Sequence, residues 1–357
     1  MKNYTLVFDA ERMKYANTGL YHYCLQLGVA LKKQLNNTTY ILKFYVRKQN
    51  ENAFSKNEKY LIQKGIDKFC MPTKQVDVWH CTYQASNYFP FRTKAKVVYT
   101  IHDLNILHEP GFSPTRLKKE LHKIQIRINK ADHVVAISNF TKQDILKHLH
   151  LNNTPISVIY NGCNFYQLEK IEKPKEKPTS NFLFTIGTIN AKKNFHVLPC
   201  LLANNTMQLF IAGISDDEVY KQKIITEAIK YNALDRVVFL GAITENDKQW
   251  YLQHCEAFLF PSLAEGFGLP VIEAMYFGKP VILSTHTALP EIGGRVAYYF
   301  NTFEVRDMQQ TLQKSVAHYN NNTLQKEKII AHAKTFNWDV AAQQYINVYK
   351  SLLAVEV

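Results

Sequence analysis

The 357-residue sequence lacks several features that would place it in common classes of protein. No uninterrupted apolar run approaches the ~20 residues that span a bilayer, and the opening MKNYTLVFDAERM contains no secretory apolar segment. No C-x-x-C pair occurs among the cysteines, which are Cys24, Cys70, Cys81, Cys163, Cys200 and Cys255. We therefore expect reduced thiols in a cytoplasmic protein, and neither a disulfide framework nor a zinc site.

Ligand sets for metals are missing as well. The sequence has no D-x-D triplet and no His/Asp cluster at metal-ligand spacing, so we expect no metal and no cofactor. The formal charge of +13 nevertheless predicts anionic partners, which could be nucleoside diphosphates, acidic lipid or nucleic acid. A basic nucleic-acid-binding protein is the alternative in this class, but no recognisable DNA- or RNA-binding motif accompanies the basic residues.

Length and patterning indicate two domains. A chain of this size suits two ordinary cores, and strands alternate with helices through both halves. This pattern predicts an α/β protein with two Rossmann-like, doubly wound domains of parallel sheet. We expect a first domain over 1–168, a charged, proline-punctuated linker over 169–180, a second domain over 181–335 and a C-terminal amphipathic helix within 336–357.

The stretch PSLAEGFGLPVIEAMYFGKPVILSTHTALPEIGG, residues 261–294, carries the strongest functional signal. Glu265 directly precedes the glycines of a loop (266–268). Glu273 follows in the first turns of a helix with Pro270 at its first position. Glycines allow backbone N–H groups to approach a ligand, and a helix N-terminus suits a phosphate. Because both carboxylates could bind hydroxyls, the pattern favours a nucleotide-sugar; the alternative is ordinary turn glycines with acids near a helix start.

A second phosphate-binding pattern opens the second half. The strand 182–186 leads to Gly187, and Lys192 and Lys193 follow at the start of a helix. A glycine and paired cations after a strand favour binding of a diphosphate. Solvated surface lysines are the alternative.

Two loops of the first half follow buried strands. After the strand at 6–9, Gly19, Leu20 and Tyr21 are expected in a loop that contacts an acceptor or a phosphate, or forms a plain turn. The strand 95–101 delivers His102 and Asp103 at its end, a favourable position for chemistry. A buried structural histidine is the alternative for His102.

A basic helix is predicted between residues 112 and 131. Leucine and isoleucine recur at helical spacing, and six cations face a single acid: Arg116, Lys118, Lys119, Lys123, Arg127 and Lys130 against Glu120. The helix could be a core-packed helix with a solvated face, or it could contact an anionic membrane or a phosphorylated acceptor.

Taken together, these motifs resemble those of a known family. The stretch 261–294 resembles the E-x7-E signature of retaining GT-B glycosyltransferases, in particular glycosyltransferase family 4. The motifs TIHDL (100–104), GKPV (278–281) and LPE (289–291) are similar to that family's pattern. The similarity extends from about Asp9 to the C-terminus.

The resemblance implies roles for individual residues. Glu265 would hold sugar hydroxyls, Glu273 the ribose, and Lys193 the donor diphosphate. Backbone N–H groups around Gly266, Phe267, Gly268 and Leu269 would assist, and His102 with Asp103 would lie near the reacting sugar. This chain has Thr188 where many members have arginine, which leaves Lys192 as the substitute, and it has Gly19 alone where the family usually has two glycines.

The function that the resemblance implies is a metal-independent, retaining sugar transfer. The donor would be a GDP-sugar, with mannose as the best guess, or otherwise a UDP-sugar. The acceptor would be a glycan or a polyprenyl-linked lipid in surface polysaccharide or lipopolysaccharide biosynthesis, at the cytoplasmic face of the plasma membrane. Two domains would face each other across a cleft, and the C-terminal helix would return to the first domain. A non-catalytic nucleotide-sugar-binding protein of the same fold is the alternative.

Overall fold

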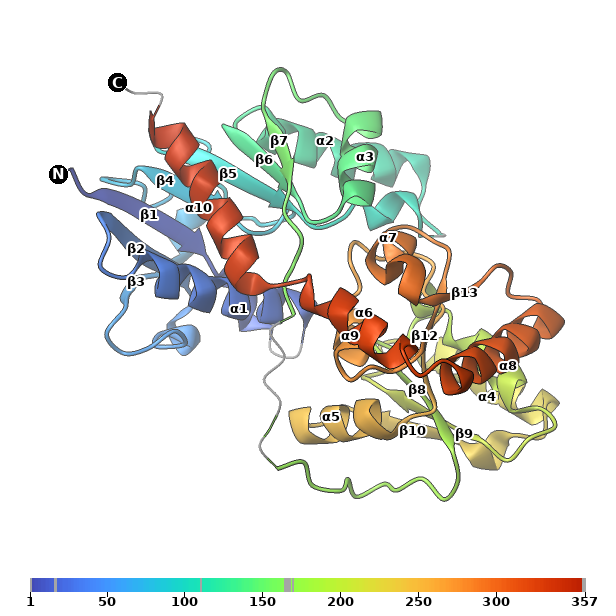
Figure 1. The fold of residues 1–357 in the computed structure, drawn as a ribbon. Helices are drawn as coiled ribbons and strands as arrows, with labels where there is room; N and C mark the ends of the chain where they lie inside the picture. Colours follow the sequence, from blue (N-terminus) through green and yellow to red (C-terminus); the bar gives the residue numbers. More distant parts are fainter. Residues whose placement is uncertain (1, 16–17, 110, 164–167, 169, 355–357) are drawn as a thin grey trace. The chain divides into compact units, whose positions relative to one another are not determined.

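The computed structural model describes residues 2–15, 18–109, 111–163, 168 and 170–354, which belong to two compact units (Figure 1). Unit 1 consists of Met1–Asn164 and Phe336–Val357, and unit 2 consists of Phe165–Thr335. The C-terminal helix is therefore part of unit 1. Much of the expected linker lies along unit 2, where the Asn246 side chain donates to the Glu172 carbonyl and Tyr251 donates to the Glu176 carbonyl.

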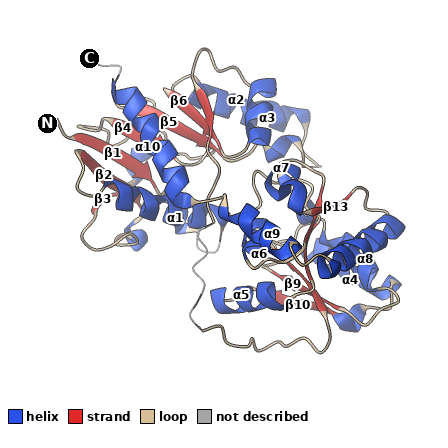
Figure 2. Ribbon diagram, in the orientation of Figure 1, coloured by secondary structure: helices blue, strands red, loops and turns tan. Residues whose placement is uncertain are grey.

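In unit 1 the described strands form one seven-stranded parallel sheet in the order β3-β2-β1-β4-β5-β6-β7 (Figure 2). Their bounds are Tyr4–Asp9 (β1), Tyr40–Val46 (β2), Lys59–Ile62 (β3), Val78–Cys81 (β4), Lys96–Ile101 (β5), His133–Ala136 (β6) and Ile156–Val158 (β7). Short runs of β-branched and aromatic residues, apolar on both faces, explain why these strands are buried.

Helices cover both faces of this sheet. Their bounds are Gly19–Leu35 (α1), Pro114–Ile128 (α2), Asn139–His148 (α3) and Trp338–Ala354 (α10). Alternate residues of β1 divide between the two sides: Leu6 and Phe8 pack with α1 and α10, whereas Val7 packs with α2 and α3. Each face of the unit 1 sheet therefore packs against helices and forms its own hydrophobic core.

One expectation for unit 1 is wrong. Gly19, Leu20 and Tyr21 are not in a loop but form the first residues of α1. Thr18 is the N-cap, and its hydroxyl accepts a hydrogen bond from the Tyr21 backbone N–H at 3.2 Å. This capping bond starts the helix earlier than the lone glycine suggested; Asn17, also expected in the loop, lies outside the described residues.

Unit 2 has a six-stranded parallel sheet in the order β10-β9-β8-β11-β12-β13. The strands are Phe182–Ile186 (β8), Gln208–Ala212 (β9), Val237–Gly241 (β10), Ala257–Phe260 (β11), Val281–Ser284 (β12) and Tyr298–Phe300 (β13). The helices are Glu218–Lys230 (α4), Glu245–His254 (α5), Leu269–Tyr276 (α6), Leu289–Gly293 (α7), Val305–Asn321 (α8) and Gln325–Lys334 (α9). The predicted pair of Rossmann-like parallel sheets is thus confirmed.

Each sheet has a point at which the strand order reverses. In unit 1 the chain runs outward from β1 to β3 and then continues from β4 on the other side of β1; in unit 2 the reversal lies between β8 and β11. Ligands of open parallel sheets bind outside the carboxyl ends of the strands at such a reversal. The segments that follow β1, β4, β8 and β11 are therefore the places to look for a site.

Candidate functional site

Two glycines bring the ends of β8 and β9 together. The Gly187 backbone N–H donates to the Ala212 carbonyl at 3.0 Å. At Gly213, which has a φ of +132°, an added Cβ would lie 1.9 Å from the Gly187 carbonyl oxygen. Only glycine fits at position 213, and Gly187 is fixed beside the reversal point of unit 2.

Lys193 turns back from the following segment toward Gly187. It ends a short 3-10 helix, Ala191–Lys193, after which Asn194 adopts a left-handed conformation with φ 58°. A Cβ on Gly187 would lie 3.0 Å from Lys193 Cε, so the lysine side chain lies along the glycine. The Lys193 ammonium also stands 4.7 Å from the centre of the Phe260 ring. These contacts fix the cation between β8 and β11.

Glu265 is the partner of this lysine. Lys193 Nζ lies 2.5 Å from Glu265 Oε1, and each side chain is only 14% exposed. The backbones of the two loops are joined as well, because the Leu263 N–H donates to the Lys192 carbonyl at 2.9 Å. The structure therefore brings together Gly187, Lys193 and Glu265, three of the residues predicted from sequence.

The loop that carries Glu265 is held on its other side by the segment after β12. The Glu265 N–H donates to Thr287 Oγ1 at 2.9 Å, and the Ala288 N–H donates to the Glu265 carbonyl at 3.3 Å. Gly268 precedes α6 with φ +101° and without a capping side chain, and an added Cβ would press on Leu289 Cδ2 at 3.0 Å. The loop is thus rigid at its backbone, and its last glycine is required by conformation.

The start of α6 differs slightly from expectation. The helix begins at Leu269, so Pro270 occupies its second position and not its first. Phe267, in the loop before it, is buried. Because no side chain caps this helix start, the polarity of its first turn can act on a ligand at the loop.

Glu273 lies one turn into α6 and has a partner that sequence reasoning missed. Lys248 of α5 contacts Glu273 Oε1 and Glu245 Oε2, each at 2.9 Å, and its side chain is 13% exposed. Burial alone would lower the pKa of Lys248, but the two carboxylates raise it above its usual range. Each acid of the E-x7-E pair therefore has a lysine counterion, and no spacing rule pointed to Lys248.

His102 follows β5 in unit 1 and is 7% exposed. Its Nε2–H donates to the Thr82 carbonyl at 2.7 Å, which fixes the tautomer because a carbonyl only accepts. The ring packs edge-on against Tyr23, with centroids 4.6 Å apart. Burial lowers the pKa of His102 to about 4, so the imidazole is neutral at neutral pH with Nδ1 as its basic atom.

Asp103 and its neighbours form a backbone-anchored turn after His102. Asp103 Oδ1 accepts from the Asn105 N–H at 3.1 Å. Gln84 joins the turn to the segment after β4, since it accepts from the His102 N–H and donates to the Asp103 carbonyl, each at 3.1 Å. His102 and Asp103 are thus tied to the reversal point of unit 1, whereas Gly19–Tyr21 begin α1.

One predicted cation of the basic helix α2, Arg127, has a structural role that the sequence did not suggest. Ile124 and Ile128 are buried, and most of the predicted cations are exposed. Arg127, however, donates to the carbonyls of Ser86 at 2.8 Å and Lys123 at 3.0 Å, so it anchors the helix to the loop after β4. Four exposed cations remain on α2, namely Arg116, Lys118, Lys119 and Lys123, and Lys130 is exposed just after the helix ends.

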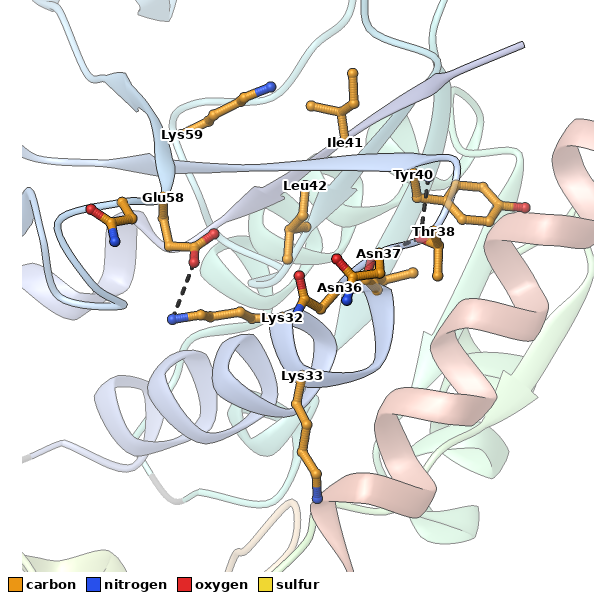
Figure 3. A pocket seen from close by; sticks show the side chains of 12 residues that line it. Lys32, Lys33, Asn36, Asn37, Thr38, Tyr40, Ile41, Leu42, Glu58 and Lys59 are labelled. Atoms are coloured by element: carbon orange, nitrogen blue, oxygen red, sulfur yellow. Dashed lines mark hydrogen bonds and ion pairs between the residues drawn. The ribbon is translucent and has the colours of Figure 1, made fainter. Parts of the chain in front are cut away.

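A cavity of about 340 Å³ lies elsewhere in unit 1 (Figure 3). Its lining includes Lys32 and Lys33 of α1, Tyr40 at the start of β2, and Glu58 and Lys59 near β3. Lys32 and Lys33 are held in ion pairs, with Glu58 at 3.1 Å and Asp339 at 2.9 Å. The cavity borders the amino end of β2. It is therefore separate from the predicted site residues of unit 1, His102 and Asp103, which follow the carboxyl end of β5.

Within the described residues, neither a cluster of metal ligands nor a membrane-spanning helix is present. No group of three or more His, Cys, Asp and Glu side chains in this part of the chain is arranged to hold a metal ion. No helix over the same residues is long and apolar enough to cross a membrane.

Known families match both halves of the chain. Residues 167–350 match the family described as glycosyl transferases group 1, and residues 39–165 match glycosyltransferase family 4. The first match spans unit 2 with Gly187, Lys193, Glu265 and Glu273. The second includes His102 and Asp103.

Similar proteins extend this comparison. The O-antigen chain mannosyltransferase B of Escherichia coli is 22% identical over 97% of this chain and 100% of its own. The serotype-specific mannosyltransferase WbdA of Escherichia coli is 26% identical over a match that covers 72% of this chain and 34% of that longer protein. Among solved structures, sucrose-phosphate synthase of Thermosynechococcus elongatus has the same fold, with a TM-score of 0.78, 18% identity, and coverage of 99% and 100% of the two chains.

Proposed function

The chain belongs to the glycosyl transferases group 1 family, and on that premise we propose that it transfers mannose from GDP-mannose to a glycan acceptor in surface polysaccharide biosynthesis. The pairing of Lys193 with Glu265 at the reversal point of unit 2 is the observation that carries this proposal. In this proposal Lys193 is the cation that binds the diphosphate, and Glu265 is the carboxylate that accepts hydrogen bonds from the sugar hydroxyls. The choice of mannose rests on relatives that are named as mannosyltransferases of O-antigen synthesis.

Donor binding is assigned to unit 2. The Lys193 ammonium, assisted by Lys192 and the backbone around Gly266–Leu269, neutralises charge that builds on the departing diphosphate. Glu265 accepts hydrogen bonds from the transferred sugar, and Glu273, held by Lys248, accepts them from the ribose. In the free protein Lys193 and Glu265 satisfy each other, so the site is prepared for both ligands without rearrangement of its loops.

We further propose that the transfer needs no metal and retains the anomeric configuration. A lysine and a helix start at the diphosphate position supply the positive charge that a metal supplies in other enzymes. Front-face attack by the acceptor accounts for retention with Glu265 as a hydrogen-bond acceptor. A covalent role of Glu265 would instead predict a glycosyl-enzyme adduct, which mass spectrometry of the quenched reaction would detect.

Acceptor binding is assigned to unit 1. His102, neutral and with Nδ1 available as a hydrogen-bond acceptor, is suited to orient a hydroxyl of the reacting sugar. Asp103 and the first turn of α1 at Gly19–Tyr21 complete this side. The exposed cations of α2 would attach the enzyme peripherally to the anionic inner face of the plasma membrane, where a lipid-linked acceptor resides.

A donor screen tests the proposal. Release of nucleoside diphosphate is measured from GDP-mannose, other GDP-sugars and UDP-sugars with no acceptor added. In a competent site, water replaces the missing acceptor at a slow but measurable rate. We therefore expect GDP-mannose to release its nucleoside diphosphate faster than the other sugar nucleotides. Faster release from a UDP-sugar would change the donor, and binding without any release would favour a non-catalytic nucleotide-sugar-binding protein.

A further inference from the structure

The reversal point of unit 1 holds an arginine, Arg12, whose buried Nε has no hydrogen-bond partner among the described residues. Arg12 lies in the 3-10 helix η1, Glu11–Lys14, directly after β1. Its guanidinium carbon stands 4.3 Å from the centre of the Tyr83 ring and 4.7 Å from that of Tyr15. Tyr83 follows β4, so the two residues bridge the place where the strand order reverses.

The Arg12 guanidinium is incompletely hydrogen-bonded within the described residues. Its Nε is buried and has no hydrogen-bond partner within the described part of the chain. Among the described residues, neither of the two acids nearest to Arg12 in sequence forms a salt bridge with it. Glu11 is paired with Lys14, and Asp9 Oδ1 accepts from the Glu11 N–H at 2.9 Å. Burial raises the pKa of Asp9 to about 8 although the nearby Arg12 charge opposes this rise, so the carboxyl is mostly uncharged at neutral pH.

This arrangement is held firmly by the surrounding residues. Met13, next to Arg12, is buried, and the Ala10 N–H donates to the Tyr45 carbonyl at 2.9 Å. Thr82, next to Tyr83, donates its hydroxyl to the Asp9 carbonyl at 2.6 Å and so joins the ends of β1 and β4. Two aromatic faces therefore flank a cation whose neighbours on both strands are fixed.

We infer that Arg12 binds a phosphate group of the acceptor substrate. A guanidinium offers planar, paired N–H donors that match phosphate oxygens, and a partly buried one gains most when an anion arrives. The site is also close to the acceptor side of the reaction, because the Tyr83 and His102 rings are 6.4 Å apart. This inference rests on the proposed function, and it narrows the acceptor to a phosphate-bearing glycan.

The test is calorimetric titration of the protein saturated with GDP, or with UDP if the donor screen selects it. The probes are mannose 6-phosphate, mannose and glucuronate. We expect mannose 6-phosphate to bind most tightly, and the Arg12→Gln variant to bind it at least about 10-fold more weakly, the scale for loss of a charged hydrogen-bonding group. Arg306→Gln is the control, because Arg306 is an exposed arginine on α8 of unit 2 and has no assigned role in binding.

Other results would overturn the inference or reassign the phosphate. Unchanged binding of mannose 6-phosphate by a folded Arg12→Gln variant would overturn it, as would glucuronate binding as tightly as the sugar phosphate. If Arg12→Gln instead weakened binding of the nucleotide and not of mannose 6-phosphate, Arg12 would bind a phosphate of the donor. The assignment to the acceptor would then be wrong. Donor turnover is measured separately, so a failed donor screen and a failed titration remain distinguishable.

A measurement on the unmodified protein covers the case in which Arg12→Gln does not fold. Phenylglyoxal modifies arginine side chains, and peptide mass spectrometry reports the extent at each residue. Mannose 6-phosphate should slow modification of Arg12 and leave that of Arg306 unchanged. Equal rates at Arg12 with and without mannose 6-phosphate would contradict the inference.

Discussion

Lys193 and Glu265 form an ion pair of 2.5 Å across the reversal point of unit 2, between the loops that follow β8 and β11. At 14% exposure each, neither side chain is screened by solvent as a surface pair would be. The pair therefore orients both groups before any substrate arrives. It joins in space two residues that lie 72 positions apart in the sequence.

Removal of the lysine should damage the chemical step. We expect Lys193→Ala to lower kcat by at least ~100-fold and to weaken nucleotide binding, because it removes the cation that we propose binds the leaving diphosphate. Steady-state kinetics with calorimetry measure both effects. Lys192→Ala is the neighbouring control, and a larger loss in that variant would transfer the diphosphate contact to Lys192. Unchanged turnover in Lys193→Ala would remove this residue from the site.

Lys248 should act on the nucleotide through Glu273. The Lys248→Gln variant leaves Glu273 and Glu245 without their shared counterion, so the orientation of Glu273 is lost and affinity for the nucleoside diphosphate should fall about tenfold, with kcat affected less. Lys248→Arg should restore most of the affinity. Lys221→Gln, which breaks an exposed pair on α4, is the control. A drop in thermal stability with normal affinity would show a purely structural role.

The exposed cations of α2 should bind anionic membranes. Replacement of Lys118, Lys119 and Lys123 by Gln should reduce co-sedimentation with liposomes of anionic lipid, since each cation near such a surface contributes ~1 kcal/mol. Thermal stability should hardly change, because these side chains are exposed. Salt should weaken the binding of the unmodified protein. If that protein shows no salt-sensitive binding, α2 is ordinary surface.

Buried histidines should make the fold sensitive to mild acid. Burial lowers the pKa of His102 from 6.5 to about 4 and that of His80 from 6.5 to about 3. Below pH 6.5 these histidines take up protons in the unfolded chain but not in the native state, so their contribution lowers stability as pH falls from 6.5 to 4. Asp9, with a native pKa of about 8, contributes in the opposite direction over this range. Near pH 5.5 each histidine should lower the free energy of unfolding by about 1.4 kcal/mol.

Urea unfolding at several pH values measures this dependence. His102→Gln should flatten the fall in stability between pH 6.5 and 5, whereas the exposed His122→Gln should leave it unchanged. An identical pH dependence in His102→Gln and the unmodified protein would contradict the neutral, buried state of this histidine.

Much of the fold followed from the sequence because strand and helix patterns are local. The strand expected over 95–101 is β5, Lys96–Ile101, and the C-terminal helix expected within 336–357 is α10, Trp338–Ala354. The start of α1 was misplaced because a single capping bond from Thr18 decides it. Local patterns predict elements well and their first residues poorly.

The site was predictable only in part. Lys193 and Glu265 stand in motifs with recognisable spacing, and the structure brings them into contact. Lys248 and Arg12 could not be found in this way, since their importance arises from what faces them across the fold: Glu273 from α6, and Tyr83 from the segment after β4. Tertiary pairing of distant residues leaves no periodic trace in a single sequence.

The central claim is that the two signature acids serve one glycosyl-transfer site in different ways. An interaction tightened in the transition state lowers kcat, and one shared with the bound ground state mainly weakens binding. Glu265→Gln should therefore cut kcat steeply with nucleotide affinity little changed. Glu273→Gln should weaken binding of the free nucleoside diphosphate by ~1.5–3 kcal/mol.

Calorimetry of both variants with GDP and UDP, beside steady-state kinetics, is the most direct measurement of this claim. The account predicts a kinetic defect for Glu265→Gln and a binding defect for Glu273→Gln. An equal loss of nucleotide affinity in both variants would contradict the division of roles, and full activity in both would contradict the assignment as a glycosyltransferase.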